Sequence, residues 1–172
     1  MRSLIAGIGY LHLSDSSVGV VAAKALQEET WPDNVVVQDF SYGPIGVMHT
    51  INEVSPPYDR MILITAADFG ARPPAMRWSR WSEPLPDADE VQARIGEALS
   101  GVVDWKNLLV ILQQFGALPP EVFVIAIQPV KTDAGIELTP GVQQLMPEVL
   151  RLARELASSE TPEAVAESGI AH

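Results

Sequence analysis

The chain has 172 residues, of which 47% are hydrophobic, and this is enough apolar material for the core of a single globular domain. It carries 11 basic and 22 acidic side chains, and the resulting formal charge of −11 repels phosphate backbones and anionic lipids, so we expect neither a nucleic acid nor a membrane surface as a partner. Cysteine is absent, which excludes a disulfide, a thiolate nucleophile and a cysteine-ligated metal centre and favours a reducing, cytoplasmic location.

Apolar runs and helix-like spacings alternate along the chain. In chain order they predict a strand at Ser3 to Ala6, a helix at Ser17 to Glu29, a buried strand at Asn34 to Gln38, a helix at Gly43 to Val54, a strand at Met61 to Ala66, a short strand or loop at Met76 to Trp78, helices at Val91 to Leu99 and Asp104 to Phe115, a strand at Val122 to Ile127 and a long helix from Thr139-Pro140 to about Ala157. Such alternation is typical of a parallel sheet with helices on both faces. We therefore expect an α/β fold, a three-layer sandwich around a mostly parallel five-stranded sheet, in residues 1–158, followed by a flexible tail at 159–172.

An acidic residue follows each of the first three predicted strands. Asp15, Asp39 and Asp68 lie in these loops, and in an open α/β sheet the loops at the carboxyl ends of the strands form the functional edge. Each of them also has a structural interpretation, because Asp15 can cap the following helix and the other two can stabilise strand-ending turns. A catalytic role and a structural role both stay open for these carboxylates.

The glycines of Gly7-Ile8-Gly9 resemble half of a dinucleotide-binding loop, but His12 stands where the third glycine of G-x-G-x-x-G is required. We interpret the two glycines as residues that permit a sharp turn after the first strand. The sequence also lacks a P-loop, an H-E-x-x-H zinc motif and a G-x-S-x-G nucleophile motif. It therefore carries none of these common nucleotide-binding or hydrolase signatures.

Four segments in the right order and spacing resemble the [NiFe]-hydrogenase maturation endopeptidases, over about residues 3 to 157. They are Gly7-x-Gly9 with Leu13-Ser14-Asp15-x-x-Val18-Gly19-Val20, Val36-Val37-x-Asp39 with Gly43-x-x-Gly46, Ile62-Leu63-Ile64-Thr65-Ala66-Ala67-Asp68-x-Gly70, and Leu118-Pro119-Pro120-Glu121-Val122 through Gln128-Pro129 to Thr139-Pro140. The resemblance implies the fold of that family. It also implies the family's activity, which is removal of the C-terminal extension of the hydrogenase large subunit after nickel insertion.

The departures from the family pattern fall on its metal-binding set. The resemblance implies an acidic ligand directly after the loop aspartate, an aspartate at the end of the third strand and a histidine before a later helix. Here those positions read Ser16, Thr65 and no histidine within Leu99 to Asp104, and Tyr10 replaces the family's asparagine after G-x-G. Neutral hydroxyls are weak ligands for nickel or zinc. We therefore expect no metal cofactor at this position.

A substitute metal site is the exception to that expectation. His12, Asp15 and Asp68, with His49, offer an imidazole and carboxylates that could hold nickel or zinc. The alternative is that His12 faces solvent in its loop and His49 lies partly exposed on the second helix. Restoring the family pattern with Ser16→Glu, Thr65→Asp and a histidine near Val102 should then create metal affinity.

A second distinctive feature is the segment Arg77-Trp78-Ser79-Arg80-Trp81, which concentrates arginine and tryptophan in an otherwise acidic chain. These residue types dominate binding hot spots, so Arg77, Trp78, Arg80 and Trp81 are candidates for a partner-binding surface. In the structural alternative, Trp78 closes the sheet edge and Arg80 pairs with Glu83.

Three hypotheses about function remain. The chain is a divergent maturation endopeptidase, or it is a non-catalytic chaperone or binding factor for a hydrogenase large-subunit precursor, with the same fold and no metal site. A third hypothesis is small-molecule binding at the strand-loop edge, through Asp15, Asp39 and the hydroxyls of Ser16 and Thr65. The sequence leaves open whether the protein is an enzyme.

Overall fold

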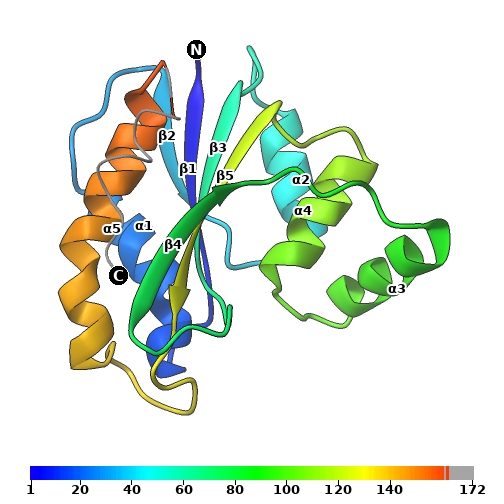
Figure 1. Ribbon diagram of the computed structural model, residues 1–172. Coiled ribbons are helices and arrows are strands. Elements are labelled where there is room, and N and C mark those ends of the chain that lie inside the picture. The colour runs from blue at the N-terminus through cyan, green and yellow to red at the C-terminus, as the bar shows by residue number, and fades with distance from the viewer. Residues whose placement is uncertain (161, 163–172) are drawn as a thin grey trace.

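Five strands form one sheet in the computed structural model, which describes residues 1–160 and 162 (Figure 1). They are β1 (Ser3–Ile8), β2 (Val35–Asp39), β3 (Arg60–Ala66), β4 (Ala75–Arg80) and β5 (Glu121–Gln128). The strand order is β2-β1-β3-β5-β4, and every neighbouring pair is parallel except β4 and β5. The expected mostly parallel five-stranded sheet is thus confirmed, and the ambiguous segment around Met76 is a six-residue antiparallel edge strand.

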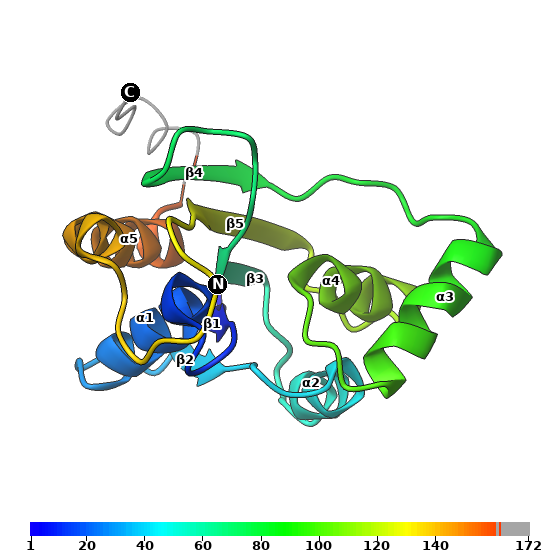
Figure 2. The ribbon, with the colours of Figure 1, turned by 90° about the horizontal axis from the view of Figure 1, so that it is seen from below.

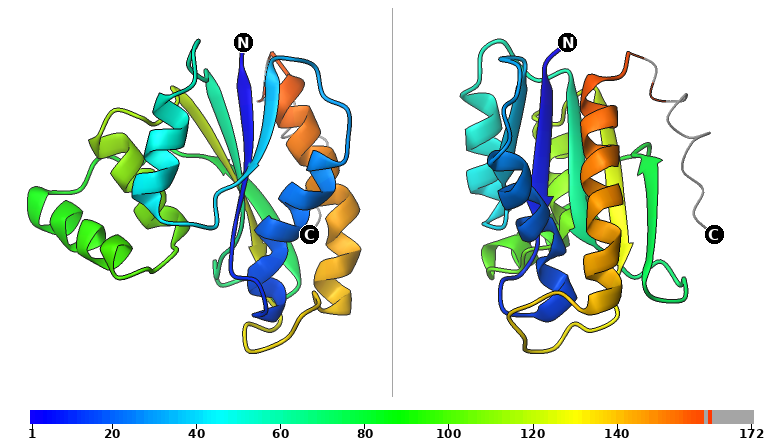
Figure 3. Two further views of the ribbon diagram at one scale, coloured as in Figure 1. Left: turned by 180° about the vertical axis from the view of Figure 1, so that it is seen from behind. Right: turned by 90° about the vertical axis from the view of Figure 1, so that its left-hand side faces the viewer.

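Helices cover both faces of this sheet (Figure 2). They are α1 (Val18–Gln27), α2 (Pro44–Asn52), α3 (Ala88–Leu99), α4 (Trp105–Gln114) and α5 (Pro140–Ser158), and a short 3₁₀ helix, η1 (Ser14–Ser17), precedes α1. α1 and α5 lie on one face, α2 and α4 lie on the other, and α3 packs outside α4 (Figure 3). This arrangement is the three-layer sandwich that the alternation of elements predicted.

Successive residues of the central strands supply two separate cores. In β1, Ile5 packs with α1 and α5, whereas Leu4 and Ala6 pack with α2 and α4, because neighbouring side chains of a strand point to opposite faces. β2 differs from the expectation of a buried strand. It lies at the edge of the sheet, and only Val35 among its residues is buried.

Gly7 and Gly9 are required by close packing rather than by a left-handed turn. A Cβ atom on Gly7 would lie 1.9 Å from the carbonyl oxygen of Gly19 in α1, and one on Gly9 would lie 2.3 Å from the carbonyl oxygen of Ser16. Neither glycine has a positive φ. The two glycines therefore let η1 and α1 pack directly against the end of β1.

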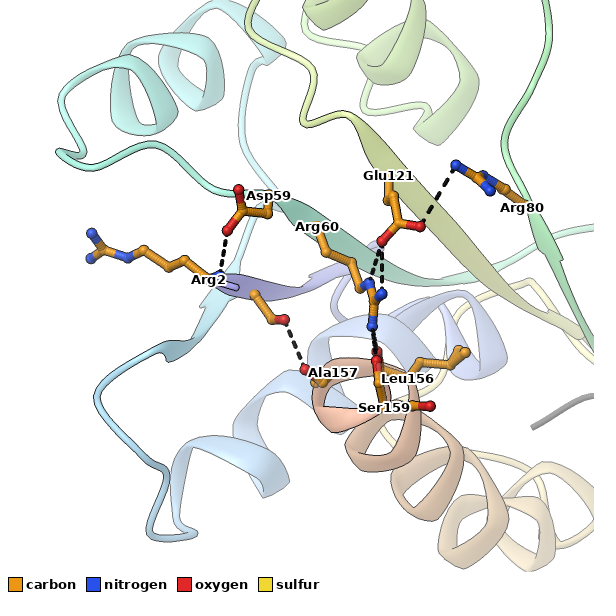
Figure 4. A network of polar contacts seen from close by, with 9 residues as sticks. Arg2, Asp59, Arg60, Arg80, Glu121, Leu156, Ala157 and Ser159 are labelled. Atoms are coloured by element: carbon orange, nitrogen blue, oxygen red, sulfur yellow. Dashed lines mark hydrogen bonds and ion pairs between the residues drawn. The ribbon is translucent and has the colours of Figure 1, made fainter. Parts of the chain in front are cut away.

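A buried arginine, Arg60 at the start of β3, holds the C-terminal end of α5 (Figure 4). The Arg60 side chain is 2% exposed, and its Nη1 donates to the carbonyl oxygens of Leu156 and Ser159, both at 2.7 Å. Its Nε and Nη2 donate to the Glu121 carboxylate at 2.9 and 2.7 Å. The Ser3 hydroxyl donates to the Ala157 carbonyl oxygen at 2.8 Å, so β1 and β3 hold the end of this helix directly, and Glu121 of β5 holds Arg60 in place.

The expected flexible tail from residue 159 falls mostly outside the described residues, so the division into residues 1–158 and 159–172 stays a prediction. Among the described residues, no helix is both long and apolar enough to cross a membrane.

Candidate functional site

A pocket of about 160 Å³ opens at the carboxyl ends of β1 and β3, beside the N-terminus of α4. Its lining residues are Ile8, Gly9, Tyr10, Ser16, Thr65, Ala66, Val103, Asp104 and Trp105. Ser16 and Thr65, which the sequence placed at the family's metal-binding positions, therefore share one pocket. The segment expected to carry the third position also contributes, through Val103 and Asp104 rather than through Val102.

Hydrogen bonds from two loops and from β3 hold the walls of the pocket. The backbone N–H of Val103 donates to the Tyr10 hydroxyl oxygen at 2.7 Å, which joins the loop after β1 to the loop before α4. Asp104 caps α4 by accepting the N–H of Asn107 at 2.9 Å. Thr65 is only 4% exposed, and its hydroxyl donates to the Ala66 carbonyl oxygen at 3.1 Å. The side chains around the pocket are thus oriented by contacts with the backbone.

The residues of the pocket do not fit a nickel or zinc ion. Such an ion needs several imidazole, thiolate or carboxylate donors, and the lining offers one carboxylate, Asp104, with the neutral hydroxyls of Ser16 and Thr65. Throughout residues 1–160 and 162, no group of three or more histidine, aspartate or glutamate side chains is arranged to hold a metal. The pocket lining therefore lacks a ligand set for either metal.

Asp15 is not among the residues that line the pocket, and its carboxylate binds the loop between β5 and α5. It is fully buried, and its carboxylate accepts the backbone N–H groups of Val130, Lys131 and Thr139 at 2.9, 3.1 and 2.7 Å. The Thr139 hydroxyl donates to the same carboxylate at 2.9 Å. Thr139 is the N-cap residue of α5, as predicted, but its side chain caps nothing, and Asp15 likewise makes no cap to α1. The partners of Asp15 lie more than a hundred residues along the chain, which is why a local capping rule did not identify them.

The other candidate acids and histidines lie apart from the pocket lining. The Asp39 carboxylate accepts the N–H of Ser41 at 2.9 Å, as expected of a strand-ending turn. Asp68 accepts the N–H of Gly70 at 2.9 Å and the side-chain amide of Gln128 at 3.1 Å, and these donors hold the pKa of its carboxyl below the usual range. His12 and His49 are both exposed, and His12 has a positive φ of 66°. The structure does not gather these residues into a substitute metal site.

The two tryptophans and the two arginines of the Trp/Arg segment have different surroundings. Trp78 packs edge-on against Phe123 at 5.8 Å, and Trp81 against Trp105 at 6.0 Å, so both rings contribute to the cores. Arg77 and Arg80 are exposed on β4. The expected pairing of Arg80 with Glu83 is wrong, because Arg80 instead forms an ion pair with Glu121 across the sheet at 3.6 Å.

Sequence reasoning did not single out Asp104 and Trp105 as site residues. Both stand at the start of a predicted helix, and a cap residue there was a usable signal, because a helix that precedes a parallel strand begins near the carboxyl edge of the sheet. Tyr10 was noted only as a departure from the family pattern, whereas its hydroxyl closes one side of the pocket.

Comparisons with known proteins point to one family. The family model described as hydrogenase maturation protease, HycI, matches residues 20–155. The hydrogenase maturating endopeptidase HybD from E. coli has a similar structure, with a TM-score of 0.64 and 24% identity over 98% of this chain and 94% of that chain. The [NiFe] hydrogenase maturation protease HycI from Thermococcus kodakarensis has a TM-score of 0.67 and 22% identity over 92% and 93% of the two chains. A comparison with curated proteins found no match.

Proposed function

Because the chain belongs to the hydrogenase maturation protease family, whose members process the C-terminal end of the hydrogenase large subunit, we propose that it binds the precursor of a [NiFe]-hydrogenase large subunit. We propose further that its role is recognition of this precursor without metal-dependent cleavage, as a maturation chaperone or binding factor. The cytoplasmic location expected from the sequence stays a prediction.

One observation carries the proposal. The pocket at the positions of the family's metal ligands is lined by Ser16 and Thr65, with a single carboxylate from Asp104. This set offers hydrogen-bond donors and acceptors to a peptide, but too few anionic or imidazole donors for nickel or zinc. The fold and the position of the pocket match the family. Ser16 and Thr65 are therefore compatible with binding of a precursor peptide, whereas metal-dependent cleavage needs ligands that these residues do not supply.

The second candidate function is the family's endopeptidase activity. The family match over residues 20–155 favours it, since it spans most of the chain. In that case Asp104 is the carboxylate available inside the pocket. The catalytic role expected for Asp15, Asp39 and Asp68 from the sequence stays a prediction, because the contacts of these side chains are those of structural residues.

One experiment separates the two functions. The purified chain is incubated with nickel-loaded large-subunit precursors, complex formation is followed by co-purification, and the C-terminus of each precursor is read by mass spectrometry. We expect a complex and an unshortened precursor. A shortened precursor establishes the endopeptidase instead, and the absence of both a complex and a shortened precursor overturns both functions.

A matched pair of variants ties the result to the pocket. Thr65→Val removes a hydroxyl that lines the pocket and keeps the side-chain volume, so it should weaken the complex. Thr50→Val removes a hydroxyl from α2, outside the pocket lining, and should leave the complex unchanged. Equal effects of the two substitutions would place the binding surface elsewhere.

A further inference from the structure

Among residues 1–160 and 162, β4 has an unpaired backbone edge on the side away from β5. The N–H of Trp81 donates to the Val122 carbonyl oxygen of β5 at 2.8 Å. Because the N–H and C=O groups of alternate residues in a strand point to the same side, those of Met76, Trp78 and Arg80 point away from β5. No described residue forms a hydrogen bond with these groups, and no described helix or strand lies beyond β4 (Figure 2).

The side chains along this edge carry positive charge. Arg77 and Arg80 are exposed on opposite faces of the strand. Arg77 is held over the Phe69 ring at 4.4 Å, and Arg80, whose side chain is 52% exposed, shares the Glu121 carboxylate with the buried Arg60. This local charge contrasts with the formal charge of −11 for the whole chain. An unpaired strand edge is a template for a further strand, and the charge beside it selects which strand can pair.

The charges disfavour a second copy of this chain as the occupant. Two β4 strands paired edge to edge would bring arginines of both copies together, and each copy carries the same excess of acidic residues. An extended segment rich in aspartate or glutamate avoids the repulsion between arginines and gains attraction to Arg77 and Arg80 at the strand, against the long-range repulsion of the chain's net charge of −11. Its backbone can pair with Met76, Trp78 and Arg80, while its carboxylates lie beside the two guanidinium groups.

We propose that β4 is a docking edge for an extended acidic segment of a partner protein, which adds as a sixth strand beside Met76, Trp78 and Arg80 and pairs its carboxylates with Arg77 and Arg80. This site is separate from the pocket, and it does not depend on the precursor-binding function proposed above.

Three synthetic peptides test the proposal on the full chain by fluorescence anisotropy. The first repeats two glutamates followed by two valines, so that carboxylates lie on both faces of the extended peptide. The second has lysine in place of glutamate, and the third is the glutamate peptide with every backbone nitrogen methylated. We expect binding of the first peptide only. The net negative charge of the whole chain attracts the lysine peptide non-specifically. Tighter binding of that peptide would show that net charge, and not the arginines of β4, decides binding, and it overturns the proposal. Equal binding of the methylated peptide also overturns it, because that peptide keeps the charges and cannot pair as a strand.

A double variant and its control locate the binding site. Arg77→Gln with Arg80→Gln should weaken the glutamate peptide roughly two- to thirtyfold, the range expected for two exposed ion pairs. Lys24→Gln with Lys106→Gln removes the same charge from α1 and α4 and should have little effect. Amide hydrogen exchange at Met76, Trp78 and Arg80 should slow when the peptide binds. Unchanged exchange there places the peptide elsewhere and overturns the proposal, whatever the variants do to the fold.

Discussion

Replacing Asp15 by asparagine should cost a large part of the stability of the fold. The carboxylate accepts three backbone N–H groups and the Thr139 hydroxyl without any exposure to water. The amide of asparagine has one oxygen, which can accept two hydrogen bonds, and its NH₂ group would face the remaining donors. Two buried donors therefore lose their acceptor, at about 1–3 kcal/mol each, so we expect a loss of about 2–6 kcal/mol.

That loss is large against a total of about 5–15 kcal/mol for a typical domain, and urea denaturation measures it through the midpoint and slope of the transition. Asp39→Asn is the matched control, because Asp39 accepts one backbone N–H in a partly exposed turn and should lose no more than about 1 kcal/mol. If Asp15→Asn costs no more than the control, the reasoning that Asp15 supports the loop between β5 and α5 is refuted.

Three further predictions address packing, pH and metal binding. Gly7→Ala should destabilise the fold by about 3 kcal/mol, because its Cβ meets the backbone of α1, whereas Gly96→Ala, with open space around its Cβ in α3, should be neutral or stabilising in the same urea assay. Arg154 donates two hydrogen bonds to Glu29 and holds the pKa of that carboxyl below its usual range, so the pair contributes stability above the unfolded-state pKa and loses it as the pH falls through the folded-state pKa. Glu29→Gln should therefore lower the urea midpoint at neutral pH and have a smaller effect near about pH 3, and a difference independent of pH would contradict this assignment. The unmodified chain should not bind nickel or zinc stoichiometrically in calorimetry, whereas the triple variant Ser16→Glu, Thr65→Asp and Val103→His should bind one of them. If the triple variant does not bind either metal, the three side chains do not converge in the pocket.

The parts of the fold that rest on local pattern could be predicted from the sequence. β1, β3 and β5 were identified because continuous apolar runs mark strands that are buried on both faces. β4 was ambiguous because it is half-exposed and carries arginines, which are unlike a buried run. The predicted start of α3 was three residues late, although Asp87 accepts the N–H of Glu90 as a cap that the acidic run already contained.

The contacts that join distant segments could not be predicted in this way. Asp15 was assigned to a local cap or to catalysis, whereas its partners lie in the loop before α5. Arg60 reaches Glu121 and the end of α5, and no spacing rule connects these positions. The position of both residues at the carboxyl ends of the strands follows from the rule for open α/β sheets. That Ser16 and Thr65 line one pocket could be expected only from the family resemblance, which assigns both positions to one metal site.

The contact between Ser3 and Ala157 places the two ends of the described domain side by side, at the edge of the sheet opposite the pocket. A linker attached at Met1, just before β1, therefore leaves from the side remote from the pocket. Protein immobilised on a sensor surface through such a linker should present the pocket to the solution. The precursor-binding measurement can thus use the tethered chain without the support blocking access.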